Sequence, residues 1–421
     1  MDNTPKGNRL HIALMGRTNA GKSSLLNLIT GQDIAITSSI AGTTTDIVEK
    51  AMELLPLGPV LFLDTAGLND VSELSTARLH KTSRVFDRAD VILLVTEPDS
   101  WSEYEDAVLA KAKTNRIPVL VVINKIDVRP PSADHLTMIG RKGTPVMTVS
   151  CIDAFRRNDY LESLKRRLLE IAPADFIAAP AIIGDLIAPG GLAVLVVPID
   201  LQAPKGRLIL PQVQTIRDAL DNDAAVLVVK ERELASQMAN LNRPPDIVVC
   251  DSQAILKVSA DVPGNIPCTT FSILLARQKG DLPAMARGAA AIEDLQSGDR
   301  ILIAEACTHH ALEDDIGRVK IPRWLRQYLG IDIQIDISSG RDYPDNLDQY
   351  KLIIHCGACM LTRREMLTRL HKAVDAKVAI TNYGVAISFL QGVIKRTLGP
   401  FPGARLAFER EWKEKKKKEK L

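Results

Sequence analysis

Residues 16–24 read GRTNAGKSS, and this short stretch decides how the first part of the chain folds. It fits the pattern G-x-x-x-x-G-K-S and lies between an apolar run at 11–15, HIALM, and a helical pattern at 24–30, SLLNLIT. Glycines let such a loop curl so that its backbone N–H groups point at phosphate oxygens, and the dipole of the following helix adds to the attraction. The stretch therefore predicts a phosphate-binding loop between a strand and a helix.

Polar residues at the end of this loop supply the chemistry that a nucleoside triphosphate requires. Lys22 is expected to reach the β- and γ-phosphates, and the hydroxyl of Ser23 is expected to bind Mg²⁺. Gly21 and Ser24 complete the set of residues that we expect around the phosphates. We therefore predict binding of a nucleoside triphosphate together with Mg²⁺.

The identity of the base is indicated by NKID at 124–127, which follows the apolar run VLVVI. Asp127 can accept hydrogen bonds from two guanine N–H groups at once. Adenine offers no such pair of donors, and leaving buried groups unpaired makes its rejection steep, on the order of 10⁴. Asn124 and Lys125 are expected to brace the base and the phosphate loop. GTP is therefore the predicted nucleotide.

Two further segments are expected at the nucleotide. DTAG at 64–67 follows the apolar run VLFL, so Asp64 is placed to hold Mg²⁺ through a water and the amide of Gly67 to meet the γ-phosphate. Ser150 and Cys151 lie where the last base-contacting loop is expected. We predict Lys22, Asp64 and Gly67 as part of the set that hydrolyses GTP.

The first part of the chain has an α/β pattern, in which apolar, β-branched runs alternate with segments of helical period. The runs that we interpret as strands lie at 9–16, 58–65, 89–96, 117–125 and 144–151. Because these runs are continuous rather than alternating, they predict strands covered on both faces, hence a mostly parallel sheet between helix layers.

Two smaller α/β units are expected after the first, which gives predicted domains at 1–174, 180–263 and 264–421. The strands expected in these units lie at 192–200, 224–230, 245–251, 299–307 and 349–356. A long helix is expected from about Arg363 to Val374, and the Pro in PQVQTIRDALD suits the first turn of a helix.

The overall composition limits the class of partner. The 421 residues carry a formal net charge of +2, which predicts no nucleic-acid partner. The sequence has no signal-peptide pattern and no apolar run long enough to cross a bilayer, so we expect no membrane association and a cytoplasmic protein. The strongest charge bias is the basic tail at 409–421, which we interpret as a solvated helix end.

The third predicted domain contains two clusters of cysteine and histidine. EACTHH at 305–310 and LIIHCGACML at 352–361 each lie at the end of an expected strand. In open α/β sheets, ligands bind outside the carboxyl ends of the strands, so both clusters are candidates for one functional site. Six cysteines in this length are too few for a disulfide scaffold, and clustered cysteines indicate metal or redox chemistry.

Three kinds of site are compatible with these thiols. Cys307, Cys356 and Cys359 with one histidine would make a Cys₃His zinc site. The same three thiolates would also hold a 4Fe–4S cluster with one accessible iron. A redox pair fits less well, because that motif opens a helix after a first strand and leaves Cys307 unexplained. Composition does not rank zinc against iron.

Taken together, the motifs of the first domain resemble the Era/TrmE-like branch of the translation-factor-type GTPases. AGTTTD at 41–46 resembles the switch motif of that branch, which implies that Thr44 binds Mg²⁺ and takes part in catalysis; Thr45 replaces the usual Arg. Asn19 matches the residue that helps to bind K⁺ in potassium-dependent members. Leu68 stands where Ras-type enzymes carry the Gln that orients water, so hydrolysis is expected to be slow without K⁺ or a partner.

The whole chain is similar to the HydF family of GTPases, which act in the maturation of FeFe-hydrogenase. The residues that carry this resemblance are PIDLQAPKGRLILPQVQ at 198–214, C-x-H at 307–309 and H-C-x-x-C at 355–359. The resemblance implies a 4Fe–4S cluster on Cys307, Cys356 and Cys359, with His355 and His309 as possible further ligands and His310 outside the motif. It also implies that the middle domain forms a homodimer and that the third binds the cluster.

The resemblance further implies a scaffold or carrier that assembles or delivers the diiron subcluster to apo FeFe-hydrogenase. Its partners would be two radical-SAM maturases and the hydrogenase itself. One alternative is a zinc-stabilised, Era/TrmE-like regulatory GTPase acting on RNA or the ribosome. Another is a thiol enzyme regulated by its GTPase domain, which predicts a reactive thiolate and activity that survives without metal.

Overall fold

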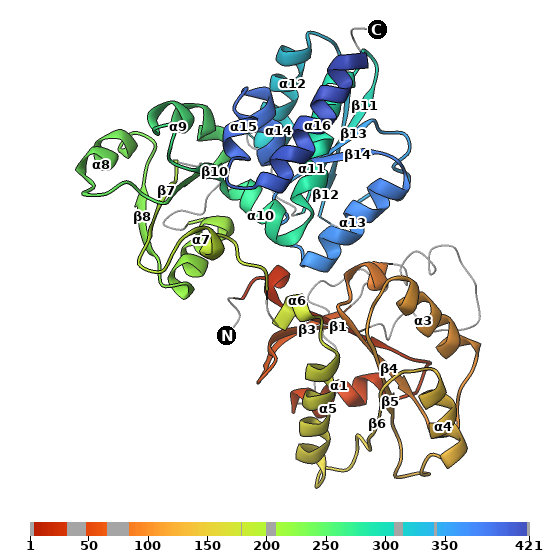
Figure 1. The fold of residues 1–421 in the computed structure, drawn as a ribbon. Helices are drawn as coiled ribbons and strands as arrows, with labels where there is room; N and C mark the ends of the chain where they lie inside the picture. The colour runs from red at the N-terminus through yellow and green to blue at the C-terminus, as the bar shows by residue number, and fades with distance from the viewer. Residues whose placement is uncertain are drawn as a thin grey trace. The chain divides into compact units, whose positions relative to one another are not determined.

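The computed structural model describes residues 4–31, 48–64, 84–177, 179–198, 208–306, 315–340 and 343–418. The chain divides into two units, Met1–Ala179 and Pro180–Leu421, and Figure 1 labels their elements. Several residues singled out in the sequence lie outside the described ranges, namely Thr44, Thr45, Gly67, Leu68, Cys307, His309 and His310. Among the described residues, no helix combines the length and apolar character needed to span a bilayer.

The first unit is built on a six-stranded sheet with the order β2-β3-β1-β4-β5-β6. The five strands predicted from the sequence are present and parallel: β1 (Leu10–Met15), β3 (Gly58–Asp64), β4 (Val91–Thr96), β5 (Val119–Ile123) and β6 (Val146–Thr148). A further strand, β2 (Val48–Leu54), pairs antiparallel with β3 at one edge. Its sequence VEKAMEL contains three charged residues, which suits an edge with one solvated face.

Helices cover both faces of this sheet, as the continuous apolar runs predicted. Along β1, Ile12 and Leu14 contribute to one hydrophobic cluster, whereas Ala13 and Met15 contribute to the cluster on the other face. The helices that pack on the first cluster are α1 (Lys22–Thr30) and α5 (Arg157–Ile171), and those on the second are α3 (Glu103–Thr114) and α4 (Ala133–Arg141). The short α6 (Ala174–Ile177) follows α5.

The second unit contains two four-stranded parallel sheets that share one hydrophobic core. The first sheet has the order β10-β9-β7-β8, with β7 (Leu192–Val196), β8 (Ala225–Val229), β9 (Ile247–Cys250) and β10 (Cys268–Thr270). The second has the order β12-β11-β13-β14, with β11 (Arg300–Glu305), β12 (Gln334–Ser339), β13 (Leu352–His355) and β14 (Ala379–Asn382). The predicted α/β class is therefore confirmed in both units.

Helices surround these two sheets. They are α7 (Leu210–Asp221), α8 (Leu234–Asn240), α9 (Ile255–Asp261), α10 (Phe271–Lys279), α11 (Leu282–Ala289), α12 (Ile321–Leu329), α13 (Arg363–Asp375), α14 (Tyr383–Leu390), α15 (Ile394–Thr397) and α16 (Pro402–Lys418). The predicted helix from Arg363 is α13, and Pro211 occupies the first turn of α7 as expected. Residues 409–418 of the tail belong to α16, where Trp412 packs on Phe389 with ring centroids 5.3 Å apart.

Two features of the second unit place the described start of the first thiol segment, Glu305 and Ala306, beside the second segment. β11 and β13 are neighbours, with Ala304 opposite His355, so the carboxyl ends of both strands meet at one edge of the sheet. α10 follows β10 of the first sheet and packs against α13 and α14 of the second (Figure 1). The loop between β13 and α13 therefore lies beside α10.

Candidate functional site

The phosphate-binding loop connects β1 to α1, and its backbone depends on residues that accept a positive φ angle. Gly16, Asn19 and Gly21 have φ angles of 147°, 65° and 94°. A Cβ atom at Gly21 would lie 2.1 Å from Nδ2 of Asn124, and one at Gly16 would lie 2.2 Å from the carbonyl oxygen of Val95. Both glycines are therefore required by close contacts as well as by backbone conformation.

The side chain of Lys22 is buried within this loop. Its Nζ donates to the carbonyl oxygens of Gly16 at 2.8 Å and Arg17 at 2.9 Å. Burial lowers the pKa of Lys22, and the carboxylate of Asp64, a buried residue that ends β3, opposes this lowering. The loop thus holds a cation near a carboxylate, a pair suited to a phosphate oxygen and its Mg²⁺. Of the other predicted phosphate-site residues, Ser23 is half-buried, and Asn19 and Ser24 are exposed.

The two predicted base-contacting segments lie together after β5 and β6. Ser150 Oγ donates to Oδ1 of Asp127 at 2.5 Å, and the amide of Cys151 donates to Oδ1 of Asn124 at 3.2 Å. Nδ2 of Asn124 also donates to the carbonyl oxygen of Ala20 at 3.1 Å. Hydrogen bonds therefore link the NKID segment both to the last loop and to the phosphate-binding loop.

Lys125 and Cys151 also belong to these two segments. Lys125 adopts a φ angle of 62°, and its Nζ lies 2.5 Å from Oε1 of Glu97. Burial, followed by the charge of Asp127, raises the pKa of the Cys151 thiol to about 12. At neutral pH Cys151 therefore carries a protonated thiol, and its contribution to the site is its backbone amide.

The phosphate-binding loop is also held by α3, which the sequence analysis did not single out. The amide of Gly16 donates to the hydroxyl of Tyr104 at 3.3 Å, and Nε of Arg17 donates to Oε1 of Glu105 at 2.8 Å. The buried carboxylate of Glu105 also accepts from the amide and hydroxyl of Ser102, which closes a capping box at the start of α3. One carboxylate thus serves both the helix end and the loop.

The thiol site begins where β13 ends at His355. The Sγ of Cys356 accepts from two backbone amides, those of Ala306 at 3.1 Å and Ala358 at 3.4 Å. Ala306 directly precedes Cys307 in the sequence. Amides that donate to sulfur favour the thiolate over the thiol, and the thiolate is the form that binds metal. The donor set around Cys356 therefore fits a metal or cluster ligand.

A buried lysine lies against the same loop. Nζ of Lys279, at the end of α10, donates to the carbonyl oxygens of Cys359 at 3.2 Å and Leu361 at 2.6 Å. Burial lowers the pKa of Lys279 to about 8, against the opposing effects of Cys359, Glu365 and Cys356. Burial also raises the pKa of the Cys359 thiol, and Lys279 acts in the opposite direction. No sequence motif marks this lysine.

His355 is fully buried, and both of its ring nitrogens are engaged. Nδ1 lies 2.9 Å from the carbonyl oxygen of Cys356, and Nε2 lies 3.1 Å from Nη1 of Arg369. Because a carbonyl only accepts and a guanidinium only donates, the proton of the neutral ring is assigned to Nδ1. Arg369 also donates to the carbonyl oxygen of Gly340 at 2.8 Å and lies over the ring of Tyr343. Burial and Arg369 lower the pKa of His355 to about 3.

The ligand set predicted for a cluster is only partly within the described residues. Cys356 and Cys359 lie in the loop after β13, whereas Cys307 and His309 fall outside the described ranges. Over the described part of the chain, no group of three or more His, Cys, Asp or Glu side chains is arranged to hold a metal ion.

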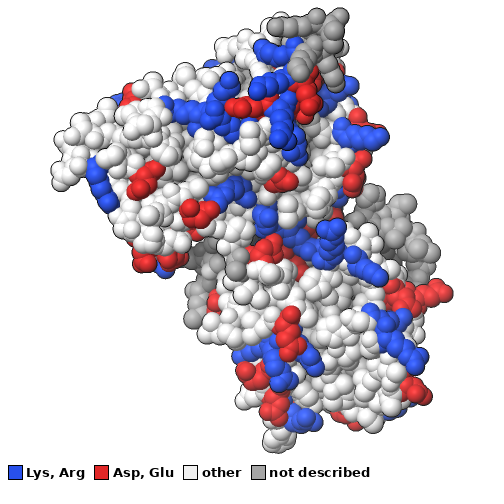
Figure 2. Space-filling model, in the orientation of Figure 1, with Lys and Arg blue, Asp and Glu red and all other residues white. Residues whose placement is uncertain are grey.

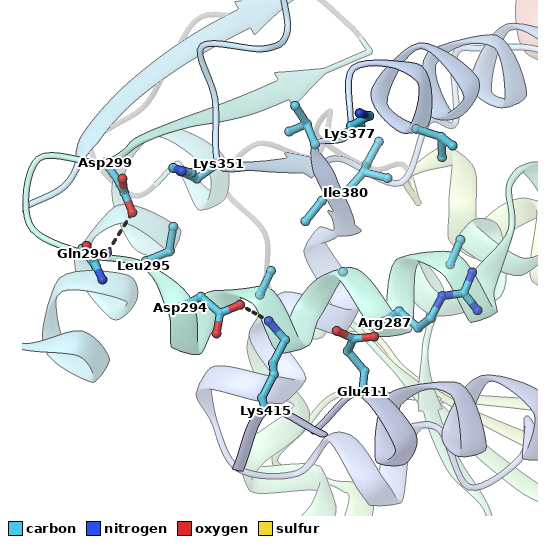
Figure 3. Close-up of a pocket in the computed structure, with 16 residues that line it drawn as sticks. Arg287, Asp294, Leu295, Gln296, Asp299, Lys351, Lys377, Ile380, Glu411 and Lys415 are labelled. Atoms are coloured by element: carbon cyan, nitrogen blue, oxygen red, sulfur yellow. Dashed lines mark hydrogen bonds and ion pairs between the residues drawn. The ribbon is translucent and has the colours of Figure 1, made fainter. Parts of the chain in front are cut away.

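A hollow of about 580 Å³ in the second unit is lined by residues outside the loop of Cys356 and Cys359 (Figure 3). Asp299 and Lys351, which line it, directly precede β11 and β13, so the hollow is at the amino ends of these strands. The thiol loop follows the carboxyl end of β13. Figure 3 shows that Asp294, in the lining of the hollow, forms an ion pair with Lys415 of α16. This hollow is therefore separate from the predicted cluster site.

Known proteins resemble the first unit as follows. Residues 11–125 match the model of the 50S ribosome-binding GTPase family. The chain is 34% identical over 168 residues to tRNA modification GTPase MnmE of Bordetella parapertussis, covering 39% of this chain and 34% of that protein. It is 37% identical over 134 residues to MnmE of Prochlorococcus marinus, covering 30% and 28%. The chain thus spans about a third of the length of these relatives.

The G domain of the T. maritima FeoB iron transporter is a solved structure with some similarity to the same unit. It has 21% sequence identity and a TM-score of 0.31, and the match covers 39% of this chain and 98% of that one. The phosphate-binding loop, the six-stranded sheet and the family match together define the first unit as a P-loop GTPase domain.

The second unit identifies the family. Residues 182–280 match the model of the hydrogen maturase F dimerization domain, and residues 283–400 match that of the hydrogen maturase F tetramerization domain. The chain belongs to the hydrogen maturase F (HydF) family, with a GTPase domain of the Era/TrmE-like type.

Proposed function

We propose that this GTPase is the scaffold or carrier of an iron–sulfur cluster. The cluster is 4Fe–4S, held by Cys307, Cys356 and Cys359, and the protein assembles or delivers the diiron subcluster to apo FeFe-hydrogenase. The observation that carries this proposal is the bond between the amide of Ala306 and Sγ of Cys356, 3.1 Å long. It joins the segment that leads into Cys307 to the loop that contains the other two thiols.

The bound cluster would supply an iron whose fourth position is exchangeable, to which a second metal unit can attach and from which it can leave. Cys307, Cys356 and Cys359 would supply the three thiolates, and the amides of Ala306 and Ala358 donate to Sγ of Cys356. His355 and His309 are the possible ligands that the resemblance implies for the fourth position. For His355, direct binding through Nε2 requires that Arg369 first move away.

In the GTPase domain we propose Mg²⁺-dependent hydrolysis of GTP, with Ser23, Thr44 and Asp64 at the metal. Lys22 neutralises charge on the phosphates, and the amide of Gly67 meets the γ-phosphate. K⁺ bound with the help of Asn19 would supply the charge that Ras-type enzymes obtain from a partner. Base recognition is assigned to Asp127, with the backbone of Cys151 beside it.

We infer that the protein works as a homodimer, which is consistent with the match to a dimerization domain. β8 is the last strand of its sheet, and its Val228 side chain is 43% exposed. An edge strand with exposed apolar side chains can pair with another chain. The radical-SAM maturases and apo FeFe-hydrogenase are further proposed partners, and the cytoplasm is the proposed location.

A zinc-stabilised GTPase acting on RNA is the alternative. The tRNA modification GTPases match the first unit, whereas the second unit matches domains of hydrogen maturase F. On the face drawn in Figure 2, Lys and Arg are interspersed with Asp and Glu, which does not favour a broad surface for nucleic acid on that face.

Anaerobic reconstitution with iron and sulfide tests the proposal. Wild-type protein should become brown and show a 4Fe–4S spectrum, and Cys307→Ala and Cys356→Ser should lose it. Cys268→Ser is the matched control, because Cys268 is a buried, free cysteine in the other sheet. A colourless protein that carries one zinc ion per chain would reject the cluster and favour the alternative.

A further inference from the structure

Lys279 is a charged residue in an unusual position. It is 3% exposed, at the end of α10, and its ammonium group donates to two backbone carbonyls of the loop after β13. Burying an ammonium group costs free energy unless acceptors or opposite charges compensate it. The carbonyl oxygens of Cys359 and Leu361 supply acceptors, so this lysine fixes the backbone on both sides of Met360.

Hydrogen bonds between this loop region and α10 are donated from both sides. Arg363, in the first turn of α13, donates from Nη1 to the carbonyl oxygens of Gln278 and Gly280 at the end of α10. Lys279 of α10 thus donates hydrogen bonds to the loop, and Arg363, which follows the loop, donates hydrogen bonds to the end of α10. A Cβ at Gly357 would lie 3.6 Å from Leu275, so the C-x-x-C turn itself packs on the same helix.

Three acidic groups among the described residues act on the charge of Lys279. The groups that favour its charged form are Cys359, Glu365 and Cys356, in that order. Two of these three are thiols of the proposed cluster site, and both carry negative charge when they bind iron. After burial, the charge of Lys279 has the largest effect on the pKa of the Cys359 thiol, and it lowers that pKa.

We propose, on the basis of the cluster site proposed above, that Lys279 is a positioning residue of that site. Its ammonium group holds the loop through the carbonyls of Cys359 and Leu361, and its positive charge offsets the thiolates of Cys356 and Cys359. A nearby positive charge stabilises the cluster after it accepts an electron, so Lys279 raises the reduction potential of the cluster.

The test compares Lys279→Met, which keeps most of the aliphatic stem, with Lys279→Arg and with Arg363→Met as the matched control. In reconstituted protein, Lys279→Met should shift the reduction potential to a more negative value, and Lys279→Arg should restore it. Arg363→Met removes a cation that holds the other side of the same contact, and it should leave the potential unchanged. An unchanged potential in Lys279→Met, or an equal shift in Arg363→Met, would overturn the charge role.

A second measurement uses the metal-free protein and is independent of the cluster. Amide hydrogen exchange at residues 357–361 should become roughly tenfold faster in Lys279→Met, because two hydrogen bonds to this loop are lost. Exchange at the wild-type rate would overturn the positioning role. If wild-type protein assembles no cluster, the proposed function and the charge role both fail, whereas the exchange result still decides whether Lys279 positions the loop.

Discussion

Arg369 donates a hydrogen bond from Nη1 to Nε2 of His355 over 3.1 Å, while Nδ1 of the same ring bonds to the carbonyl oxygen of Cys356 over 2.9 Å. The imidazole is thereby held as a neutral ring with its proton on Nδ1. Arg369 occupies the nitrogen that an iron atom would need. Access of His355 to a cluster therefore depends on the position of Arg369.

The first prediction concerns this pair. In cluster-loaded protein labelled with ¹⁵N-histidine, pulsed EPR of the reduced cluster should show no directly bound nitrogen from His355, because Arg369 holds Nε2. His355→Gln should keep the cluster, with the loop loosened by loss of one bond to Cys356. His371→Gln, at an exposed residue of α13, is the control. A strong nitrogen coupling that disappears in His355→Gln would identify the ring as a ligand and contradict the prediction.

The second prediction concerns pH and His11 in β1. Burial, followed by the charge of Arg88, lowers the pKa of His11 to about 4, with Glu49 acting in the opposite direction. The unfolded chain binds a proton at His11 below about pH 6.5, whereas the folded chain does not until about pH 4, so stability is lost as the pH falls. Between pH 6.5 and pH 5 the loss from this group should be about 2 kcal/mol.

Urea unfolding of the wild type and His11→Asn at several pH values measures this effect. The variant should be less stable at pH 7 but should lose less stability on acidification. His371→Gln should show the wild-type slope. Identical slopes for His11→Asn and the wild type would show that His11 does not cause the pH dependence.

The third prediction concerns potassium. Asn19 is exposed in the phosphate-binding loop with a φ angle of 65°, so its side chain is not packed against the sheet. GTP hydrolysis should be faster in K⁺ than in Na⁺, and Asn19→Ala should abolish the difference. Asn115→Ala, at the end of α3, should behave as the wild type. Equal rates in the two salts for the wild type would reject the assignment of K⁺ to Asn19.

The fourth prediction concerns Glu105, which joins the start of α3 to the phosphate-binding loop through Arg17. Glu105→Gln removes the charge of a buried carboxylate that accepts three hydrogen bonds, so we expect a loss of about 1–3 kcal/mol in stability and weaker GTP binding. Glu103→Gln changes an exposed residue in the same turn and is the matched control. Calorimetric titration with GTP that gives the same affinity for Glu105→Gln and the wild type would exclude a role in shaping the loop.

Sequence patterns predicted the elements whose structure depends on residues close together in the chain. The continuous apolar runs located the central strands, whereas the edge strands β2, β10, β12 and β14 were missed. Charged and polar residues interrupt β2 and β12, and β10 and β14 are only three and four residues long. Both thiol segments were expected at strand ends, but only the pairing of β11 with β13 makes those ends adjacent. Lys279 is 80 residues from Cys359, so its contact with the loop depends on how α10 packs and leaves no local pattern.

The last prediction concerns the dimer. Val228 in the edge strand β8 is 43% exposed, and Val213 in α7 is 47% exposed, so the two positions are matched in residue type and exposure. If β8 pairs with β8 of a second copy, a charged side chain at Val228 would be desolvated at the interface, whereas one at Val213 would remain in water. Val228→Lys should therefore convert the dimer to a monomer in light scattering at micromolar concentration, and Val213→Lys should leave it intact. Dissociation caused by Val213→Lys alone would assign the interface to the helical face of this sheet instead of its edge.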